Sequence, residues 1–163
     1  MLAAIIVALG SAAPSIPAQA EWDAGAKPAI TVSIAAPSRP VKIDDKVTLD
    51  VKIAIDQGPF RASPFLAASR GVSFQVTDTK GVVVRPLEPM PISPPAPPVQ
   101  PGALVSIDPG KPLSIQVKEP AKYLFPGAGK FKVRATIRFM DASSTPPHYL
   151  SATSDGVIVE VGK

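Results

Sequence analysis

The segment KFKVRATIRF (residues 130–139) has a charged or hydroxyl side chain on every second residue and an apolar side chain between them. Successive side chains of a β-strand point to opposite faces of the sheet, so this alternation indicates a strand with one buried face and one solvated face. The solvated face carries four cations, which we call the basic row: Lys130, Lys132, Arg134 and Arg138.

The same alternation recurs along the chain from residue 29, and helical periodicity is almost absent. Antiparallel sheets with one wetted face give this pattern, and two such sheets bury their apolar faces against each other. The sequence therefore predicts an all-β fold, an immunoglobulin-like antiparallel β-sandwich, with a closed β-barrel as the alternative. The predicted strands, about seven in number, cover residues 29–35, 46–55, 72–78, 82–84, 113–118, 130–139 and 156–161.

The first twenty residues contain no charged side chain, and residues 2–9 (LAAIIVAL) form a compact apolar run. Ala18-Gln19-Ala20 then provides a small-x-small cleavage site, as in a secretory signal peptide. The run is too short to span a bilayer, which needs about 20 apolar residues. We expect a signal peptide at 1–20, a linker at 21–28 and one domain at 29–163, in a periplasmic or secreted protein with no transmembrane span after signal removal. An unfolded N-terminal tail is the alternative.

Eight of the 21 prolines fall in the segment RPLEPMPISPPAPPVQP, residues 85–101. Proline cannot donate to the ladder of a central strand and favours extended polyproline II geometry. Residues 86–101 are therefore predicted to form a long Pro-rich loop that crosses between the two sheets or lies outside them. Recognition of this loop by an aromatic groove of a partner is the functional alternative.

The connection from Asp56 to Gly71 has the signals of a short helical turn, because Ser63 can cap it, Pro64 suits its first position and Gly71 can end it. Three apolar side chains in this connection are expected to close one end of the sandwich. Alternatively, they form an exposed contact for a partner. These candidate partner residues are Phe60, Phe65 and Leu66.

The segment KYLFPGAGKFKVRATI (residues 122–137) resembles the turn and following strand of bacterial secreted immunoglobulin-like modules. These modules show an apolar residue, then Pro-Gly, then an aromatic that opens a strand, and the counterparts here are Leu124, Pro126-Gly127 and Phe131. The resemblance covers residues 100–161 and implies a non-catalytic binding or scaffolding module. The aromatic is often Tyr, bonded back to the turn. Phe131 lacks the hydroxyl, so packing alone must hold this corner.

Residues suited to catalysis or metal binding are few. The chain has no Cys and one His, His148, so neither a thiolate site nor a cluster of imidazole ligands is available. Ser143, Ser144 and Asp141 lie near His148, but no GxSxG elbow accompanies them. We therefore predict no enzymatic activity, no cofactor and no metal. Calcium binding by loop carboxylates stays open, although no EF-hand spacing occurs. These carboxylates are Asp56, Asp141 and Asp155.

The basic row has two interpretations. The outward face of any strand must be polar, and we expect the acids Asp50 and Glu160 on neighbouring strands to neutralise the row. Alternatively, its cations form a line about 26 Å long, near the charge repeat of an acidic polysaccharide or a phosphate-bearing lipid surface. The formal net charge of +4 favours anionic partners without requiring nucleic acid, which we do not expect because no exposed aromatic is interleaved with the cations.

The sequence thus predicts an exported, monomeric or weakly associating module that binds or scaffolds in the bacterial envelope without catalysis. Its expected partner is an envelope protein or an anionic polymer. One alternative is a protease inhibitor that presents loops at the sandwich end, with Phe60 and Phe65 in the wedge. The other is a binder of anionic envelope polymer through the basic row.

Overall fold

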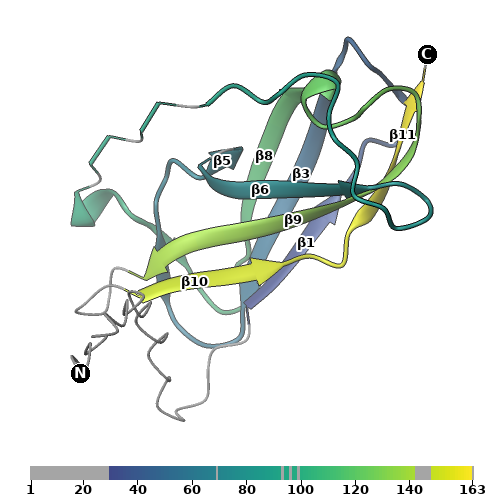
Figure 1. Cartoon of the computed structure of the whole chain (residues 1–163). Helices are drawn as coiled ribbons and strands as arrows, with labels where there is room; N and C mark the ends of the chain where they lie inside the picture. Colours follow the sequence, from purple (N-terminus) through teal and green to yellow (C-terminus); the bar gives the residue numbers. More distant parts are fainter. Residues whose placement is uncertain are drawn as a thin grey trace, which may run out of the picture.

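The computed structural model describes residues 30–68, 70–92, 94–95, 97–98, 100–141 and 148–162, and the predicted signal peptide and linker lie outside them. Within these ranges the chain forms strands, loops and two single turns of 3-10 helix, η1 (Pro101–Ala103) and η2 (Ala121–Tyr123), with no α-helix. The all-β prediction is confirmed. In Figure 1 two sets of strands cross each other, and the sheets curl as half a barrel does.

A three-stranded antiparallel sheet has the order β1 (Ile30–Ala35), β3 (Lys46–Ile55), β8 (Leu113–Pro120). The strand β3 follows the predicted alternation, because its odd-numbered residues from Val47 to Ile55 are buried. Its register pairs Val51 with Ile34 on one side and with Ile115 on the other.

The larger sheet contains six strands. Its order is β2 (Val41–Lys42), β11 (Val157–Gly162), β9 (Gly129–Asp141), β6 (Gly71–Thr77) and β5 (Ala67–Ala68), and β10 (His148–Thr153) also pairs with β9. The pairs β2–β11 and β5–β6 are parallel, so the prediction of a purely antiparallel sheet is wrong at both edges. A separate two-stranded sheet joins β4 (Phe60–Ala62) to β7 (Val105–Ile107).

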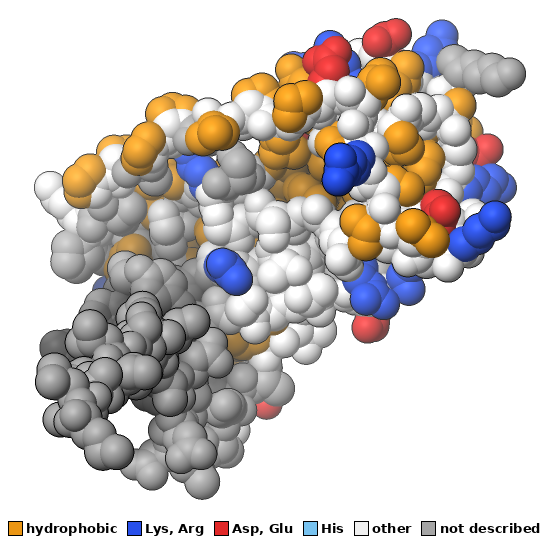
Figure 2. Space-filling view, viewed as in Figure 1, with side chains coloured by type: hydrophobic (Ala, Val, Ile, Leu, Met, Phe, Trp, Pro, Cys, Tyr) orange, Lys and Arg blue, Asp and Glu red, His pale blue; other side chains and the backbone are white. Residues whose placement is uncertain are grey.

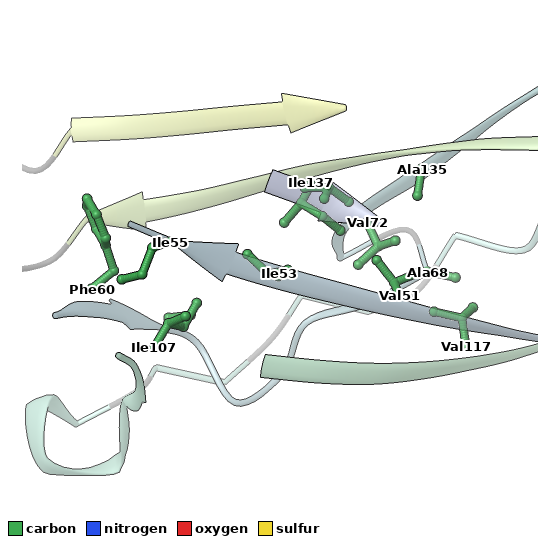
Figure 3. Packing of buried hydrophobic residues seen from close by; sticks show 12 residues of the cluster. Val51, Ile53, Ile55, Phe60, Ala68, Val72, Ile107, Val117, Ala135 and Ile137 are labelled. Carbon is green, nitrogen blue, oxygen red and sulfur yellow. The ribbon is translucent and has the colours of Figure 1, made fainter. Parts of the chain in front are cut away.

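The core consists of two apolar clusters between these sheets. Figure 3 shows the first, in which side chains from β3 and β8 meet side chains from β9 and β6. The second cluster adds the corner after β8, where Phe125 is fully buried and belongs to the same cluster as Val47 and Leu49 of β3. Three partly buried residues pack against both clusters and join them: Ile34, Phe74 and Met90.

Six of the seven predicted segments form strands, and residues 82–84 do not. Val83 makes only an isolated bridge with Thr77, since the chain between them turns tightly. Asp78 holds that turn, because its carboxylate accepts the backbone N–H groups of Lys80 and Val82, each at 2.9 Å. Five short or late strands were not predicted: β2, β4, β5, β7 and β10.

The prediction of a helical turn between Asp56 and Gly71 is wrong. The chain forms β4, a turn and β5 there. Ser63, which was expected to cap a helical turn, stabilises this turn between strands instead. Its hydroxyl accepts a hydrogen bond from the backbone N–H of Phe65 at 3.1 Å. Gly71 has a φ of +77°, as expected, but it opens β6 rather than ending a helix.

Among its described residues, the Pro-rich loop is tethered to the β core at Leu87, Glu88 and Pro94, and none of the described residues between Val84 and β7 belongs to a strand (Figure 1). The backbone N–H groups of Leu87 and Glu88 donate to the carbonyl oxygens of Phe125 and Lys122, at 2.9 and 3.0 Å. Glu88 and Lys122 also form an ion pair of 3.0 Å. Further along, Arg70 Nε donates to the carbonyl oxygen of Pro94 at 3.1 Å. The loop therefore crosses from the six-stranded sheet to the two-stranded one.

Candidate ligand-binding face

The strand β9 carries the whole basic row on one side. Alternate residues from Phe131 to Ile137 are buried in the core, so the side chains between them point the other way, into solvent. This confirms that the four cations share one face of the sheet. We call it the outer face, defined as the solvated side of β6, β9, β10 and β11.

Pairing across the strands fixes the neighbours of each cation. Lys130 lies opposite Glu160 of β11, and Arg138 lies opposite Ser151 of β10. Lys132 is flanked by Ile158 of β11 and by Thr77 of β6. Arg134 faces Gln75 of β6.

Within the described residues the basic row makes one ion pair. Lys130 Nζ lies 3.5 Å from Glu160 Oε2, and the two side chains remain 61% and 51% exposed. An exposed pair of this kind contributes about 0–1 kcal/mol. Glu160 was correctly predicted as a neighbour of the row.

The prediction for Asp50 is wrong. This residue belongs to β3 in the other sheet, where it accepts a hydrogen bond from Gln116 Nε2 at 3.0 Å. The row is therefore less neutralised than the sequence suggested, and three of its cations have no ion pair among the described residues.

Gly156 borders the stems of Lys132 and Arg134. It lies in the break between β10 and β11, and a Cβ placed there would come within 2.9 Å of Lys132 Cε, Arg134 Cγ and the Val133 carbonyl oxygen. Absence of a side chain at this position leaves room for both aliphatic stems beside Gly156. Two cations that form no ion pair among the described residues thus border the same glycine at the middle of β9.

Hydroxyl groups fill the rest of the outer face. Thr136, which interrupts the basic row, lies between Ser73 and Thr153. Its hydroxyl lies 2.9 Å from that of Thr153, and Ser73 Oγ donates to its carbonyl oxygen at 3.4 Å. Figure 2 shows the surface over β6, β9 and β10 as largely white, with isolated blue side chains. The face thus offers cations and neutral hydrogen-bonding groups to a ligand.

No family model, curated protein or solved structure matches the chain. In the part of the chain that the structure describes, no helix has the length and apolar character needed to cross a membrane.

The candidate partner residues of the loop separate into buried and exposed positions. Phe60 is 8% exposed and belongs to the first core cluster, and Leu66 packs against that cluster. Phe65 alone is exposed, at 36%. Phe60 and Leu66 therefore have the expected capping role, and of the three candidate residues Phe65 is the one exposed to a partner.

His148 was expected in a loop but opens β10, opposite Asp141. The side chains of both residues, and Ser143 and Ser144 entirely, lie outside the described part. No group of three His, Cys, Asp or Glu side chains that could hold a metal occurs among the described residues, where the calcium candidates Asp56 and Asp155 are exposed.

Ile158 was not predicted as a surface residue. Its neighbours Val159 and Val161 belong to the second core cluster, and Val157 packs against that cluster. The sequence did contain a signal for this exposure, because Ile158 is an apolar residue at an outward-facing position between two inward-facing valines. Its exposed fraction is 58%. This position adds an aliphatic group to the cationic part of the outer face.

Proposed function

We propose that the chain is an exported, non-catalytic binding module that holds a polyanion of the bacterial envelope against the outer face of its six-stranded sheet. The observation that carries this proposal is the basic row itself, four cations in one line with one ion pair among the described residues. Alternate residues of a strand lie roughly 6.6 Å apart, so a ligand with repeated charges can contact several cations at once.

We also propose that the domain is an immunoglobulin-like sandwich. Support comes from the first two strands, which are close in sequence but pair with different sheets: β1 is antiparallel to β3, and β2 is parallel to β11. Further support comes from the corner that carries the family resemblance. Phe131 packs against Phe125 with ring centroids 5.4 Å apart, in place of the hydrogen bond that a Tyr would make.

Export is supported by the signal-peptide pattern of residues 1–20. An envelope protein would meet polymers and surfaces that carry carboxylate or phosphate groups. Contacts between such groups and the row would sum, and each would weaken as salt screens it. We infer the absence of catalysis from the small number of residues suited to it, because a fold by itself does not determine function.

Retention on an immobilised polyanion tests this function. The protein is applied at low salt to agarose that carries polygalacturonate and eluted with a salt gradient. Lys132→Gln/Arg134→Gln should elute at markedly lower salt. Lys52→Gln/Lys118→Gln is the matched control, because it removes the same charge from exposed positions on the three-stranded sheet. Equal elution of the two double variants would reject the function, as would a wild-type protein that binds neither this polymer nor an anionic vesicle.

A further inference from the structure

Two exposed aliphatic side chains flank the central cation of the outer face. Ile158 and Thr77 lie on either side of Lys132. Val83 forms an isolated β-bridge with Thr77, on the side of Thr77 that is turned away from Lys132. Directly paired residues of antiparallel strands project from the same face, so Val83, Thr77, Lys132 and Ile158 form one line across the sheet. The exposed fractions of Val83 and Ile158 are 59% and 58%.

This line makes one end of the outer face amphipathic. Neighbouring strands lie about 4.8 Å apart, so Val83 and Ile158 are roughly 14 Å from each other with Lys132 between them. Lys130 and Arg134 are next to Lys132 along β9. In Figure 2 orange and blue side chains lie near one another at the right of the view, around the loop that follows β6. The other end of the face has hydroxyl groups and Arg138.

An acidic polysaccharide would use the cations but offers little that favours exposed aliphatic groups. A bilayer with anionic headgroups would use both, because phosphates attract Lys and Arg while short aliphatic side chains enter the boundary with the acyl chains. Ile158 lies within the cationic part of the outer face and Val83 borders it, and this position favours the second ligand.

We propose that the polyanion is the surface of an anionic phospholipid bilayer. The docking end consists of Lys130, Lys132, Arg134 and Ile158 of the outer face, together with Val83 at its border. This inference rests on the proposed function, since it names the ligand of the same face. Attachment of this kind is peripheral and salt-sensitive, and it needs both the charges and the aliphatic groups.

Co-sedimentation with vesicles tests the inference. The protein is mixed with vesicles of phosphatidylcholine alone or with about 30% phosphatidylglycerol, at low and at physiological salt. Wild-type protein should bind the anionic vesicles and not the neutral ones. Ile158→Ser/Val83→Ser and Lys132→Gln/Arg134→Gln should each weaken binding by about tenfold. Leu87→Ser is the apolar control, because Leu87 is equally exposed (58%) but lies in the Pro-rich loop.

The polygalacturonate column separates the two proposals. If Ile158→Ser/Val83→Ser elutes there with the wild-type protein yet loses vesicle binding, the bilayer inference stands. If this variant keeps full vesicle binding, or if wild-type protein binds the polymer and not the anionic vesicles, the bilayer inference fails and the polyanion function remains. If the wild-type protein binds neither, both fail. Circular dichroism checks that each variant is folded, which is expected because every substituted side chain is outside the core.

Discussion

Gly71 and Gly110 show how the surroundings of a residue decide the effect of a substitution. Both have a φ of +77°, in the left-handed region that L side chains adopt at a cost. A Cβ on Gly110 would meet nothing within 4 Å, whereas a Cβ on Gly71 would lie 2.6 Å from the carbonyl oxygen of Arg138. That carbonyl belongs to β9, which limits how far it can move. Substitutions at the two glycines therefore separate the energetic cost of backbone strain from the cost of a steric clash.

We predict that Gly110→Ala lowers the free energy of unfolding by about 1 kcal/mol through backbone strain alone. Gly71→Ala should lower it by about 3 kcal/mol, since the added methyl also pushes β6 away from β9. Urea unfolding followed by circular dichroism measures both values. Similar losses in the two variants would show that the close approach between Gly71 and β9 has no energetic consequence.

Lys122 has a raised pKa, mainly because its ammonium group donates a hydrogen bond to Glu88 and is attracted to its charge. Since the pKa in the folded state lies above the ordinary 10.5, the interaction is fully present below pH 10.5. It is lost as the pH rises through the higher, folded-state value. As the pH is raised, the ion pair between the Pro-rich loop and η2 should therefore persist until the solution is strongly alkaline.

We predict that Glu88→Gln lowers the pKa of Lys122 toward 10.5, measured by an NMR titration of the lysine side chain. An unchanged Lys122 titration in the variant would mean that the Glu88 ion pair is not formed in solution.

At the scale of elements, β10 and β11 behave as one strand broken at a buried serine. β10 pairs with residues 136–141 of β9, and β11 pairs with residues 129–133. Ser154 spans the break: its backbone N–H donates to the carbonyl oxygen of Ala135, and its hydroxyl accepts the N–H of Ala135, both at 2.9 Å. Ser154 is 4% exposed, so these bonds are shielded from water.

We predict that Ser154→Ala costs about 1–3 kcal/mol, because the N–H of Ala135 loses its acceptor in a buried position. Ser151→Ala, on the exposed outer face, should stay within about 0.5 kcal/mol of the wild-type protein. Amide hydrogen exchange gives a second measurement, and the N–H of Ala135 should exchange faster in the Ser154 variant. Equal stability of the two variants would contradict the structural role of the hydroxyl.

The long strands could be predicted from the sequence because each has enough residues to show its period. The segment from Lys46 to Ile55 has five alternations, whereas β2 and β5 have two residues each, too few for any period. β10 does alternate, but it follows the Ser-Ser-Thr-Pro-Pro run of residues 143–147, which is typical of a loop. In residues 63–71, signals that suit a helical turn also suit a turn between strands.

The candidate site was predicted in part for a similar reason. Alternation within one segment was sufficient to place the four cations of the basic row on one face. The neighbours of that face depend on which strands pair, and this is decided by contacts distant in sequence. Asp50 was therefore expected beside the row, although it pairs with Gln116 in the other sheet. Ile158 became visible as its neighbour only through the register of β9 and β11.

At the scale of the whole molecule, the two core clusters share three residues that pack against both: Ile34, Phe74 and Met90. The strand β3 also runs through both clusters, with Leu49 in one and Ile53 in the other, each fully buried. Loss of packing in one cluster therefore disturbs side chains of the other. A domain connected in this way should unfold as a single unit.

We predict that Leu49→Ala and Ile53→Ala each lower the free energy of unfolding by about 2–5 kcal/mol, through lost apolar burial and the cavity left behind. Each variant should unfold in urea through a single transition with a lower midpoint. The reason is that side chains of each cluster lose packing partners once the other cluster has unfolded. Ile158→Ala, at an exposed position, should change stability by less than about 0.5 kcal/mol.

Native-state hydrogen exchange supplies the decisive comparison. In Leu49→Ala the amides of Val72 and Ile137, which lie in the other cluster, should lose protection as much as the amide of Val133 does. Loss of protection at Val133 alone would mean that the clusters are separate folding units, and that the outer face rests on a sheet whose two ends open independently.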